Sequence, residues 1–420
     1  MSYVLGIDIG NTNTVAAVAR RQGATWARPE TVVLDGRSTT VPSVLHVSVD
    51  GTLIVGEPDP PDPGRTARCF LRRVGDEVPL LLGGEAWPPH TLTAALAAWV
   101  VDQVAGAEGG PAEALVFSHP SSWGPHRRDL LQWALREVGL HHVTLLPRAV
   151  TVAESHAARG VVDGTAAVYA LGGETFEAAL VRRTPYGTYE TFGRPQALDT
   201  VGGVDFDEAL AEHVRTVLAR DLAAVDPLDA PVVLRTLLPQ CELARRGLSL
   251  GDEVDVLLAL PGGTRRVPVT RPQFETMIRP AVRATVDLLV HAVHSAVPTP
   301  AQLDGVLLAG GSARVPLIAD LLTAALGIPV EVEPDPHHTT AVGAALAACQ
   351  VISPSPRPPT PRETPPAATR YAAEAVGPRR DDRHPAVPDE PPPRPPVRTA
   401  PLDLPKASRL TRIRARGREG

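Results

Sequence analysis

The chain is poor in cysteine, with three in 420 residues, and Cys69, Cys241 and Cys349 form no CxxC pair or other metal-binding spacing. They fit a reducing compartment better than a disulfide framework. Aromatic residues make up only 4%, although the 43% of hydrophobic residues is enough for a sizeable core. The net charge of -6 is modest. It creates no strong field, so we expect no nucleic-acid partner.

Long hydrophobic runs are also missing. The longest, near Leu92 to Val101, stops at Asp102 and is far too short to span a bilayer. The N-terminus has no basic segment followed by an uninterrupted apolar stretch, so we expect no signal peptide. These absences predict a cytoplasmic protein without a transmembrane segment, and its length leaves room for two domains and a tail.

The most informative stretch is LGIDIGNTNT, residues 5 to 14. It reads as an apolar strand carrying one carboxylate, Asp8, then a turn and a second apolar run from Val15 to Val18. The turn residues are Gly10, Asn11, Thr12 and Asn13. Backbone amides of such a turn can face an anion, and a carboxylate beside a phosphate needs a cation between them. The stretch therefore suggests a Mg²⁺-nucleotide, although taken alone it also fits an ordinary hairpin turn.

The remaining pattern predicts an α/β protein built from two similar halves. The first half has strands at 4–9, 15–18, 31–34, 43–49, 53–55, 114–117 and 143–146, and helices at 91–107, 125–138 and 149–159. The second half has strands at 166–171, 176–181 and 306–309, and helices at 206–222, 232–248, 271–297, 316–326 and 340–349. Both halves open with a strand, a glycine turn and a returning strand. We therefore expect them to face each other across an anion-binding cleft.

From Ser353 onward prolines accumulate and apolar residues become scarce, which predicts a disordered tail. The tail offers two kinds of contact to a protein partner. Proline clusters such as Pro391 to Pro393 suit polyproline recognition. Arginines near the C-terminus could contact an acidic partner or membrane surface, or form a solvated basic end; they are Arg409, Arg412, Arg414, Arg416 and Arg418.

Several motifs together resemble the nucleotide-binding domain of the seventy-kilodalton heat-shock chaperones (DnaK-like), in the actin and sugar-kinase superfamily. LGIDIGNTNT resembles the first phosphate loop of that family, and VYALGGETF the second. TVGGVDFDEAL, CELARRGLS, LLAGGSARVP and AVGAALA follow in family order. The resemblance spans about residues 3 to 350. It implies an actin-like ATPase fold with lobe I at 1–162, lobe II at 163–350 and a tail at 351–420.

The resemblance also implies which residues hold ATP or ADP. Arg314 would stack on adenine, as the planar guanidinium of arginine permits. Glu242, Arg245, Arg246 and Ser249 would hold the base edge and the ribose. The phosphates would lie against both glycine turns and the glycine pairs of two further motifs, that is Gly10, Asn11, Thr12, Asn13, Gly172, Gly173, Thr175, Gly202, Gly203, Gly310, Gly311 and Ser312.

The hydrolytic residues of the family are mostly replaced. A lysine, two aspartates and a glutamate position the attacking water and the hydrated Mg²⁺ in the family, and only Asp8 remains. Leu71 stands at the lysine position, Arg148 at the glutamate position and Ala170 at the second aspartate position. One positioned charge is commonly worth ~2.7–4 kcal/mol of barrier, so three losses should abolish useful hydrolysis.

Two further changes affect the phosphate end. Glu174 replaces the third glycine of the second phosphate loop and adds an anion there. His337 also departs from the family pattern, as does Asn11. One hypothesis is that Arg148 and Glu174 form a salt bridge that closes the site in place of a metal; the alternative is unrelated drift of both residues.

These observations lead to three functional hypotheses. The first is a chaperone-like ATP-binding protein that lacks the peptide-binding domain, hydrolyses ATP weakly or not at all, and acts as a nucleotide-dependent chaperone partner or scaffold. The second is a slow but genuine ATPase that uses Asp8, with Mg²⁺ held through water. The third is an actin-like filament protein. The motifs CELARRGLS and GGVDFDEAL favour the chaperone branch over the filament branch.

Overall fold

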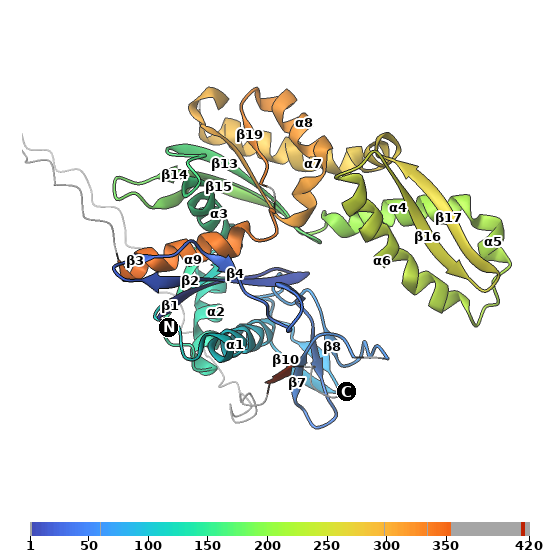
Figure 1. The fold of residues 1–420 in the computed structure, drawn as a ribbon, viewed down its shortest axis with the longest axis horizontal. Helices are drawn as coiled ribbons and strands as arrows, with labels where there is room; N and C mark the ends of the chain where they lie inside the picture. Colours follow the sequence, from blue (N-terminus) through green and yellow to red (C-terminus); the bar gives the residue numbers. More distant parts are fainter. Residues whose placement is uncertain (1, 59, 298, 334, 354–412, 416–420) are drawn as a thin grey trace, which may run out of the picture. The chain divides into compact units, whose positions relative to one another are not determined.

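The computed structural model describes residues 2–58, 60–297, 299–333, 335–353 and 413–415 (Figure 1). Its largest sheet belongs to lobe I and has the order β12-β11-β1-β2-β3. Strand β1 runs antiparallel to β2 and parallel to β11, which in turn is parallel to β12. The strands are β1 (Tyr3–Ile9), β2 (Asn13–Gln22), β3 (Thr25–Trp26), β11 (Leu115–His119) and β12 (Val143–Pro147), with β4 (Glu30–Thr31) and β5 (Thr40–Pro42) also paired to β2.

The sheet of lobe II repeats this arrangement in the order β15-β14-β13-β18-β19. Its first strand, β13, is antiparallel to β14 and parallel to β18, and β18 is parallel to β19. The strands are β13 (Thr165–Leu171), β14 (Phe176–Arg183), β15 (Tyr189–Leu198), β18 (Gly305–Ala309) and β19 (Val330–Glu331). The predicted duplication and the actin-like ATPase fold are therefore confirmed.

Strand β1 shows how side-chain alternation positions the site. Tyr3, Leu5, Ile7 and Ile9 are fully buried in the outer core of lobe I. The alternate residues face helix α9 (Thr339–Ile352), because successive side chains of a strand point to opposite faces. On that face Gly6 allows close approach: a Cβ there would lie 2.2 Å from the Ala345 nitrogen. Asp8 is next on this face and lines the pocket at the end of the strand.

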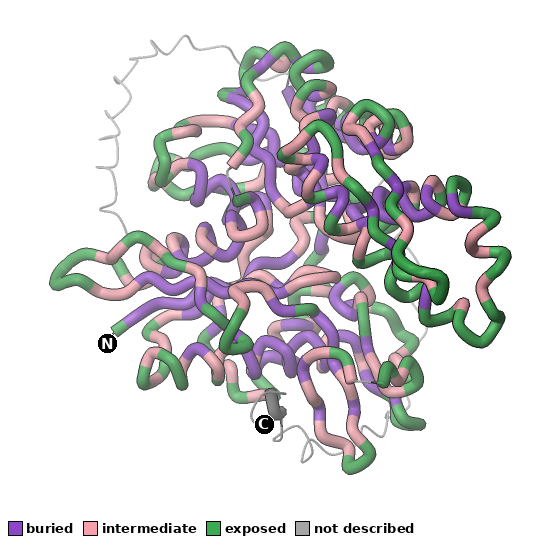
Figure 2. The backbone as a smooth tube through the Cα atoms, turned by 45° about the vertical axis from the view of Figure 1, so that its right-hand side comes forward, coloured by how far each residue is buried: buried purple, intermediate pink, exposed green. Residues whose placement is uncertain are grey.

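Helices cover both faces of each sheet. Helices α1 (Pro89–Glu108) and α2 (Pro125–Glu137) pack in the outer core of lobe I. Helices α3 (Arg148–Ala157) and α9 lie between the two sheets and contact each other closely (Figure 1). Figure 2 shows the strands of both central sheets as mostly buried.

The rest of lobe II forms a second large core with the β13 sheet. Its helices are α4 (Gly203–Val217), α5 (Ala219–Ala223), α6 (Ala230–Leu248), α7 (Arg271–Ala296) and α8 (Pro316–Leu326), and its hairpin consists of β16 (Glu253–Leu260) and β17 (Gly263–Thr270). The 3₁₀ helices η1 (Pro300–Gln302) and η2 (Gly311–Arg314) flank β18. Lobe I adds a pair, β9 (Leu80–Leu82) and β10 (Glu85–Trp87), and a small sheet of β6 (Leu45–Val47), β7 (Leu53–Val55), β8 (Thr66–Ala67) and β20 (Ile413–Ala415).

Several predicted elements differ from the structure. The strand predicted at 31–34 is limited to β4, and the helix predicted at 206–222 is divided. Leu218 leaves helical geometry (φ -95°, ψ 18°) and packs into the lobe II core, which ends α4. Strands β15, β16 and β17 were not predicted. The predicted tail lies outside the described residues except at 351–353, where α9 extends to Ile352, and at β20, whose backbone pairs with β7.

Among the described residues, no helix combines the length and the apolar character that crossing a bilayer requires.

Candidate functional site

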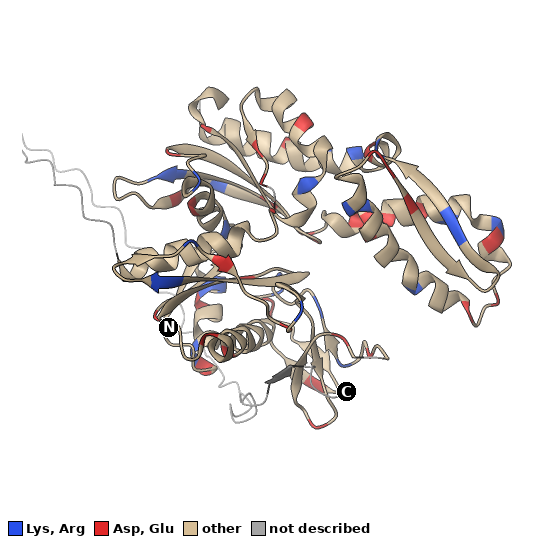
Figure 3. Ribbon diagram, in the orientation of Figure 1, with Lys and Arg blue, Asp and Glu red and all other residues tan. Residues whose placement is uncertain are grey.

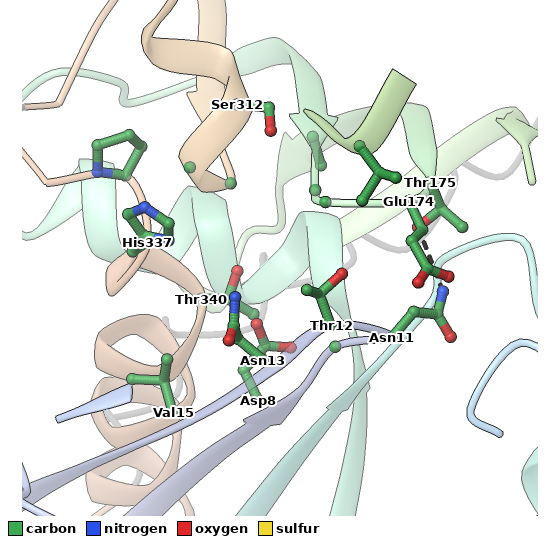
Figure 4. A pocket seen from close by; sticks show the side chains of 18 of the residues that line it. Asp8, Asn11, Thr12, Asn13, Val15, Glu174, Thr175, Ser312, His337 and Thr340 are labelled. Carbon is green, nitrogen blue, oxygen red and sulfur yellow. Dashed lines mark hydrogen bonds between the residues drawn. The ribbon is translucent and has the colours of Figure 1, made fainter. Parts of the chain in front are cut away.

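A pocket of about 150 Å³ lies where the turns after β1 and β13 meet η2 and the helices α4, α6 and α9 (Figure 4). Small-molecule sites commonly have ~300–1,000 Å³, so this cleft is narrow. The structure brings together most of the residues predicted to bind nucleotide. Its lining includes Asp8, Gly10, Asn11, Thr12, Asn13, Gly172, Gly173, Thr175, Glu242, Arg245, Arg246, Gly310, Gly311 and Ser312.

Glycines allow the loops to meet this closely. A Cβ on Gly173 would lie 2.4 Å from Thr12 Oγ1, so the two phosphate-loop candidates touch across the cleft. Gly310 has φ +84°, a left-handed conformation that other residues rarely adopt. A Cβ there would also lie 2.3 Å from the Leu171 carbonyl oxygen. The loops therefore approach their neighbours too closely to admit a side chain at either glycine.

The other four predicted binding residues do not line the pocket in this structure. They are Gly202, Gly203, Ser249 and Arg314. Gly203 lies directly behind the lining, because a Cβ there would be 2.3 Å from Ser312 Oγ. Gly202 packs against the backbone of Gly173. The Ser249 hydroxyl donates to the Arg245 carbonyl (3.0 Å), and Arg314 ends η2.

The arginines of helix α6 are held by carboxylates. Buried Arg245 donates twice to Asp207 of α4, at 2.7 Å and 3.2 Å. Burial raises the pKa of Asp207 to about 6, although Arg245 opposes the shift. Arg246 is more exposed and donates to Glu242 at 2.6 Å. Both arginines line the cleft, which suits contact with a base or sugar, and the buried pair with Asp207 fixes Arg245.

His337 lies at the other end of the pocket from Asn11 and Glu174 (Figure 4). Its ring packs on Gly311, where a Cβ would lie 1.9 Å from the ring carbon Cε1. Burial lowers the pKa of His337, so the neutral imidazole is favoured. At position 337, where the sequence departs from the family pattern, the pocket is therefore lined by an uncharged imidazole ring.

The predicted phosphate end centres on Arg148, the first residue of α3. The central strands β11, β12, β13 and β18 contain no Lys, Arg, Asp or Glu (Figure 3). The Arg148 guanidinium lies between two carboxylates, with Nη2 3.4 Å from Asp8 Oδ1 and Nη1 3.6 Å from Glu177 Oε2. The Ser118 hydroxyl donates to Asp8 (2.5 Å), and the Ser121 amide donates to Glu177 (2.5 Å). We call Asp8, Arg148 and Glu177 the Arg148 cluster.

Burial determines the electrostatics of this cluster. It disfavours the Arg148 cation, but Asp8 and Glu177 outweigh that effect and the pKa of Arg148 is raised overall. Burial also raises the pKa of Glu177, against the opposing influence of Arg148. A cation at a helix N-terminus is further opposed by the helix dipole. The two carboxylates are thus what stabilises Arg148 in this position.

The predicted salt bridge between Arg148 and Glu174 is wrong. Glu174 accepts instead from Cys69 Sγ at 2.9 Å and lies 3.8 Å from Arg72 Nη1. The physical reason is position: Glu174 is in the turn after β13, whereas Glu177 lies on β14 opposite Ala170 and is buried. Burial raises the pKa of Cys69 to about 12, and Glu174 adds to this shift.

More bonds join the two lobes beside Glu174. The Asn11 amide donates to Thr175 Oγ1 (3.4 Å, dashed in Figure 4). The Arg72 guanidinium donates to the Asp199 carbonyl (3.0 Å). Within lobe I, the Arg72 backbone amide donates to Asn11 Oδ1 (2.9 Å) and so orients the Asn11 side chain. We call this set of contacts the interlobe latch.

The residues present do not fit a magnesium site. Arg148 supplies a fixed positive charge between the carboxylates, and Ala170 offers no oxygen ligand at the equivalent point of β13. Within the described residues, no group of three or more histidine, cysteine or acidic side chains could hold a metal ion. Leu71 is only 1% exposed and belongs to the lobe I core rather than to the pocket lining.

Two carboxylates of the site, Asp207 and Glu177, were not predicted from the sequence. Both sit in the quoted motifs or directly after them, and each is paired with an arginine that the sequence did single out. A signal was available for Glu177. It is a lone carboxylate in an otherwise apolar strand stretch, the same pattern that drew attention to Asp8.

Comparison with known proteins gives a consistent result. The family described as Hsp70 protein matches residues 77–358. The chaperone protein HscA homolog of Bordetella petrii is 28% identical over 370 residues, covering 82% of this chain and 57% of that protein. The HscA homolog of Burkholderia cenocepacia is 27% identical over 371 residues, covering 82% and 58%. The chain thus spans a little over half the length of these curated relatives.

Proposed function

The chain belongs to the Hsp70 protein family, and from this premise we propose that its two lobes bind ATP or ADP while hydrolysing ATP weakly or not at all. The protein would then act as a nucleotide-dependent chaperone partner or scaffold in the cytoplasm. Its protein partner would contact a lobe surface or the proline-rich tail.

The observation that carries the proposal is the Arg148 cluster. Hydrolysis requires a positioned water and stabilisation of the charge that develops on the transferred phosphoryl group. A guanidinium engaged by Asp8 and Glu177 cannot accept a proton from water, since it has donors only. The base and sugar end keeps Arg245, Arg246 and Glu242 in the pocket lining. Binding without efficient hydrolysis is the behaviour that this combination supports.

Calorimetry of adenosine, ADP and ATP with the full chain, beside steady-state hydrolysis, tests the proposal. We expect saturable binding of adenosine and ADP and hydrolysis no faster than the blank. Turnover at rates typical of the family would overturn the proposal that hydrolysis is weak or absent. Turnover that is slow but clearly above the blank would favour the slow ATPase. Concentration-dependent sedimentation of long polymers would favour a filament protein.

A gain-of-function variant gives a complementary test. We expect the combination Arg148→Glu, Ala170→Asp and Glu174→Gly to raise hydrolysis, since it restores two carboxylates and removes an anion near the phosphates. Adding Leu71→Lys should raise it further. Leu71 is buried, so thermal unfolding must first show that the fourfold variant folds. A folded variant without any gain would contradict the assigned positions.

A further inference from the structure

We propose that Arg148 is a built-in cation of this pocket: its guanidinium replaces a divalent metal between Asp8 and Glu177, so the nucleotide binds without magnesium. This inference rests on the proposed nucleotide binding and specifies the form of the ligand, a nucleoside diphosphate that is not complexed with metal.

The Arg148 guanidinium occupies the place between two carboxylates that a metal ion would take. Only 14% of its side chain is exposed, and both of its terminal nitrogens face carboxylate oxygens, at 3.4 Å and 3.6 Å. Ser118 and Ser121 hold those carboxylates from outside the cluster. At Glu177 the two contacts use different oxygens, Oε1 for the Ser121 amide and Oε2 for the guanidinium, whereas at Asp8 both contacts share Oδ1. Arg148 also lines the pocket, so its charge faces whatever enters.

The charges of Asp8, Glu177 and Arg148 determine whether an anion can enter the pocket. Asp8 and Glu177 would repel a phosphate, and a cation has to offset that repulsion. Arginine is always charged and presents its donors in a fixed fork, so it can do this permanently. A magnesium ion entering the same space would meet the guanidinium at close range in a poorly solvated position. The repulsion would exclude the ion, and three of the four carboxylate oxygens, Asp8 Oδ1 and both of Glu177, already have a donor or cation beside them.

The direct test uses metal alone. Electron paramagnetic resonance of Mn²⁺ mixed with the full chain should show only free metal for the wild type. Arg148→Gln removes the charge and leaves two unneutralised carboxylates, so this variant should bind Mn²⁺. Mn²⁺ bound by the wild type and lost on Asp8→Asn would overturn the proposal.

Nucleotide affinity provides the second test. The wild-type Kd for ADP should agree within about threefold in EDTA and in excess Mg²⁺. Arg148→Gln should weaken ADP binding at least tenfold in EDTA, and Mg²⁺ should recover most of the loss. Arg148→Lys should keep the metal independence. A tenfold tighter wild-type affinity with Mg²⁺ would contradict the inference.

Controls separate the two proposals. Arg159→Gln removes an arginine two residues beyond α3 that pairs with Glu333 outside this pocket, and it should leave ADP affinity unchanged. Adenosine carries no phosphate, so its affinity should not respond to Arg148→Gln. If the wild type binds neither adenosine nor ADP, the proposed function fails, and the Mn²⁺ measurement then decides the role of Arg148. If Arg148→Gln does not fold, the wild-type and Arg148→Lys measurements decide it.

Discussion

At the scale of single residues, buried charges decide the character of the cleft. Arg245 is buried and Arg148 nearly so, and both are paired with carboxylates from another element. Such pairs contribute little net stability compared with apolar packing, yet the loss of one partner is costly because a charge is left unpaired. Replacing only one member of either pair should therefore destabilise the protein.

The Asp207–Arg245 pair predicts a pH effect on stability. The folded-state pKa of Asp207 is raised from 3.8 to about 6, mainly by burial. The folded form therefore binds this proton more tightly than the unfolded chain. Its contribution to stability is full below about pH 4 and is lost as the pH rises through about 6. The melting temperature of the wild type minus that of Asp207→Asn should thus fall between pH 4 and 6, as thermal unfolding at several pH values will measure.

Asp221→Asn is a suitable control for this measurement, because Asp221 pairs with Arg265 at a more exposed position. It should change the free energy of unfolding by less than ~1 kcal/mol. A difference between wild type and Asp207→Asn that grows with pH would instead mean that the ion pair outweighs burial.

At the scale of elements, the closest packing is between α3 and α9. Gly343 of α9 faces α3 so closely that a Cβ would lie 1.7 Å from the Thr151 carbonyl oxygen. On its other side α9 approaches Gly6 of β1. A backbone atom cannot move aside as a flexible side chain can, so helix and neighbours would have to separate to admit a methyl group.

Gly343→Ala should consequently destabilise the protein. Overpacking commonly costs ~1–3 kcal/mol, and contact with backbone places this site at the upper end or beyond. Gly106→Ala in α1 is the matched control, since a Cβ there meets nothing within 4 Å. The control should stabilise the helix by ~0.5–1 kcal/mol. Urea unfolding of both variants measures the two effects, and equal effects would contradict the observed packing.

The elements also show what sequence reasoning can and cannot reach. Helix α8 has the predicted bounds because Pro316 begins it and Gly327 ends it in a left-handed conformation. Strand β15 escaped prediction because Gly193 and Pro195 interrupt an edge strand with a nearby register shift. In the hairpin of β16 and β17, exposed Leu257 obscures the alternation of buried Val256 and Leu258.

The same limit applies to the site. Glycine turns and their order along the chain predicted which loops would converge, because those signals are local. The partner of Arg148 depends on how β14 lies against α3, which no local pattern specifies. Likewise, no local pattern predicts that Glu174 accepts from Cys69. Among the described residues, Cys69 is the one other than glycine with a positive φ (54°), a conformation that is uncommon for such residues.

At the scale of the whole molecule, the interlobe latch connects the halves beside the predicted phosphate end. Arg72 belongs to lobe I, whereas Asp199 and Glu174 belong to lobe II. Removing this side chain should loosen the cleft without disturbing either core, because Arg72 is exposed.

Arg72→Ala should therefore increase hydrogen exchange several-fold in the loops at 10–13 and 172–175, measured by mass spectrometry. Arg68→Ala removes a nearby arginine that pairs with Glu57 in the same lobe, and it should leave those loops unchanged. Unchanged exchange in Arg72→Ala would show that the remaining contacts, such as the Thr12 side chain against Gly173, keep the lobes together.

The position of α9 has a consequence for the order in which the protein matures during synthesis. Val4, Ala19 and Val116 are covered by Ala344, Ala347 and Ala348, which the ribosome adds after every strand of the two central sheets. Until then, one side of the N-terminal sheet remains open to water and to other chains. Such late pairing slows folding and prolongs the risk of aggregation. A nascent chain arrested before α9 should thus depend on holding factors that a full-length chain no longer needs.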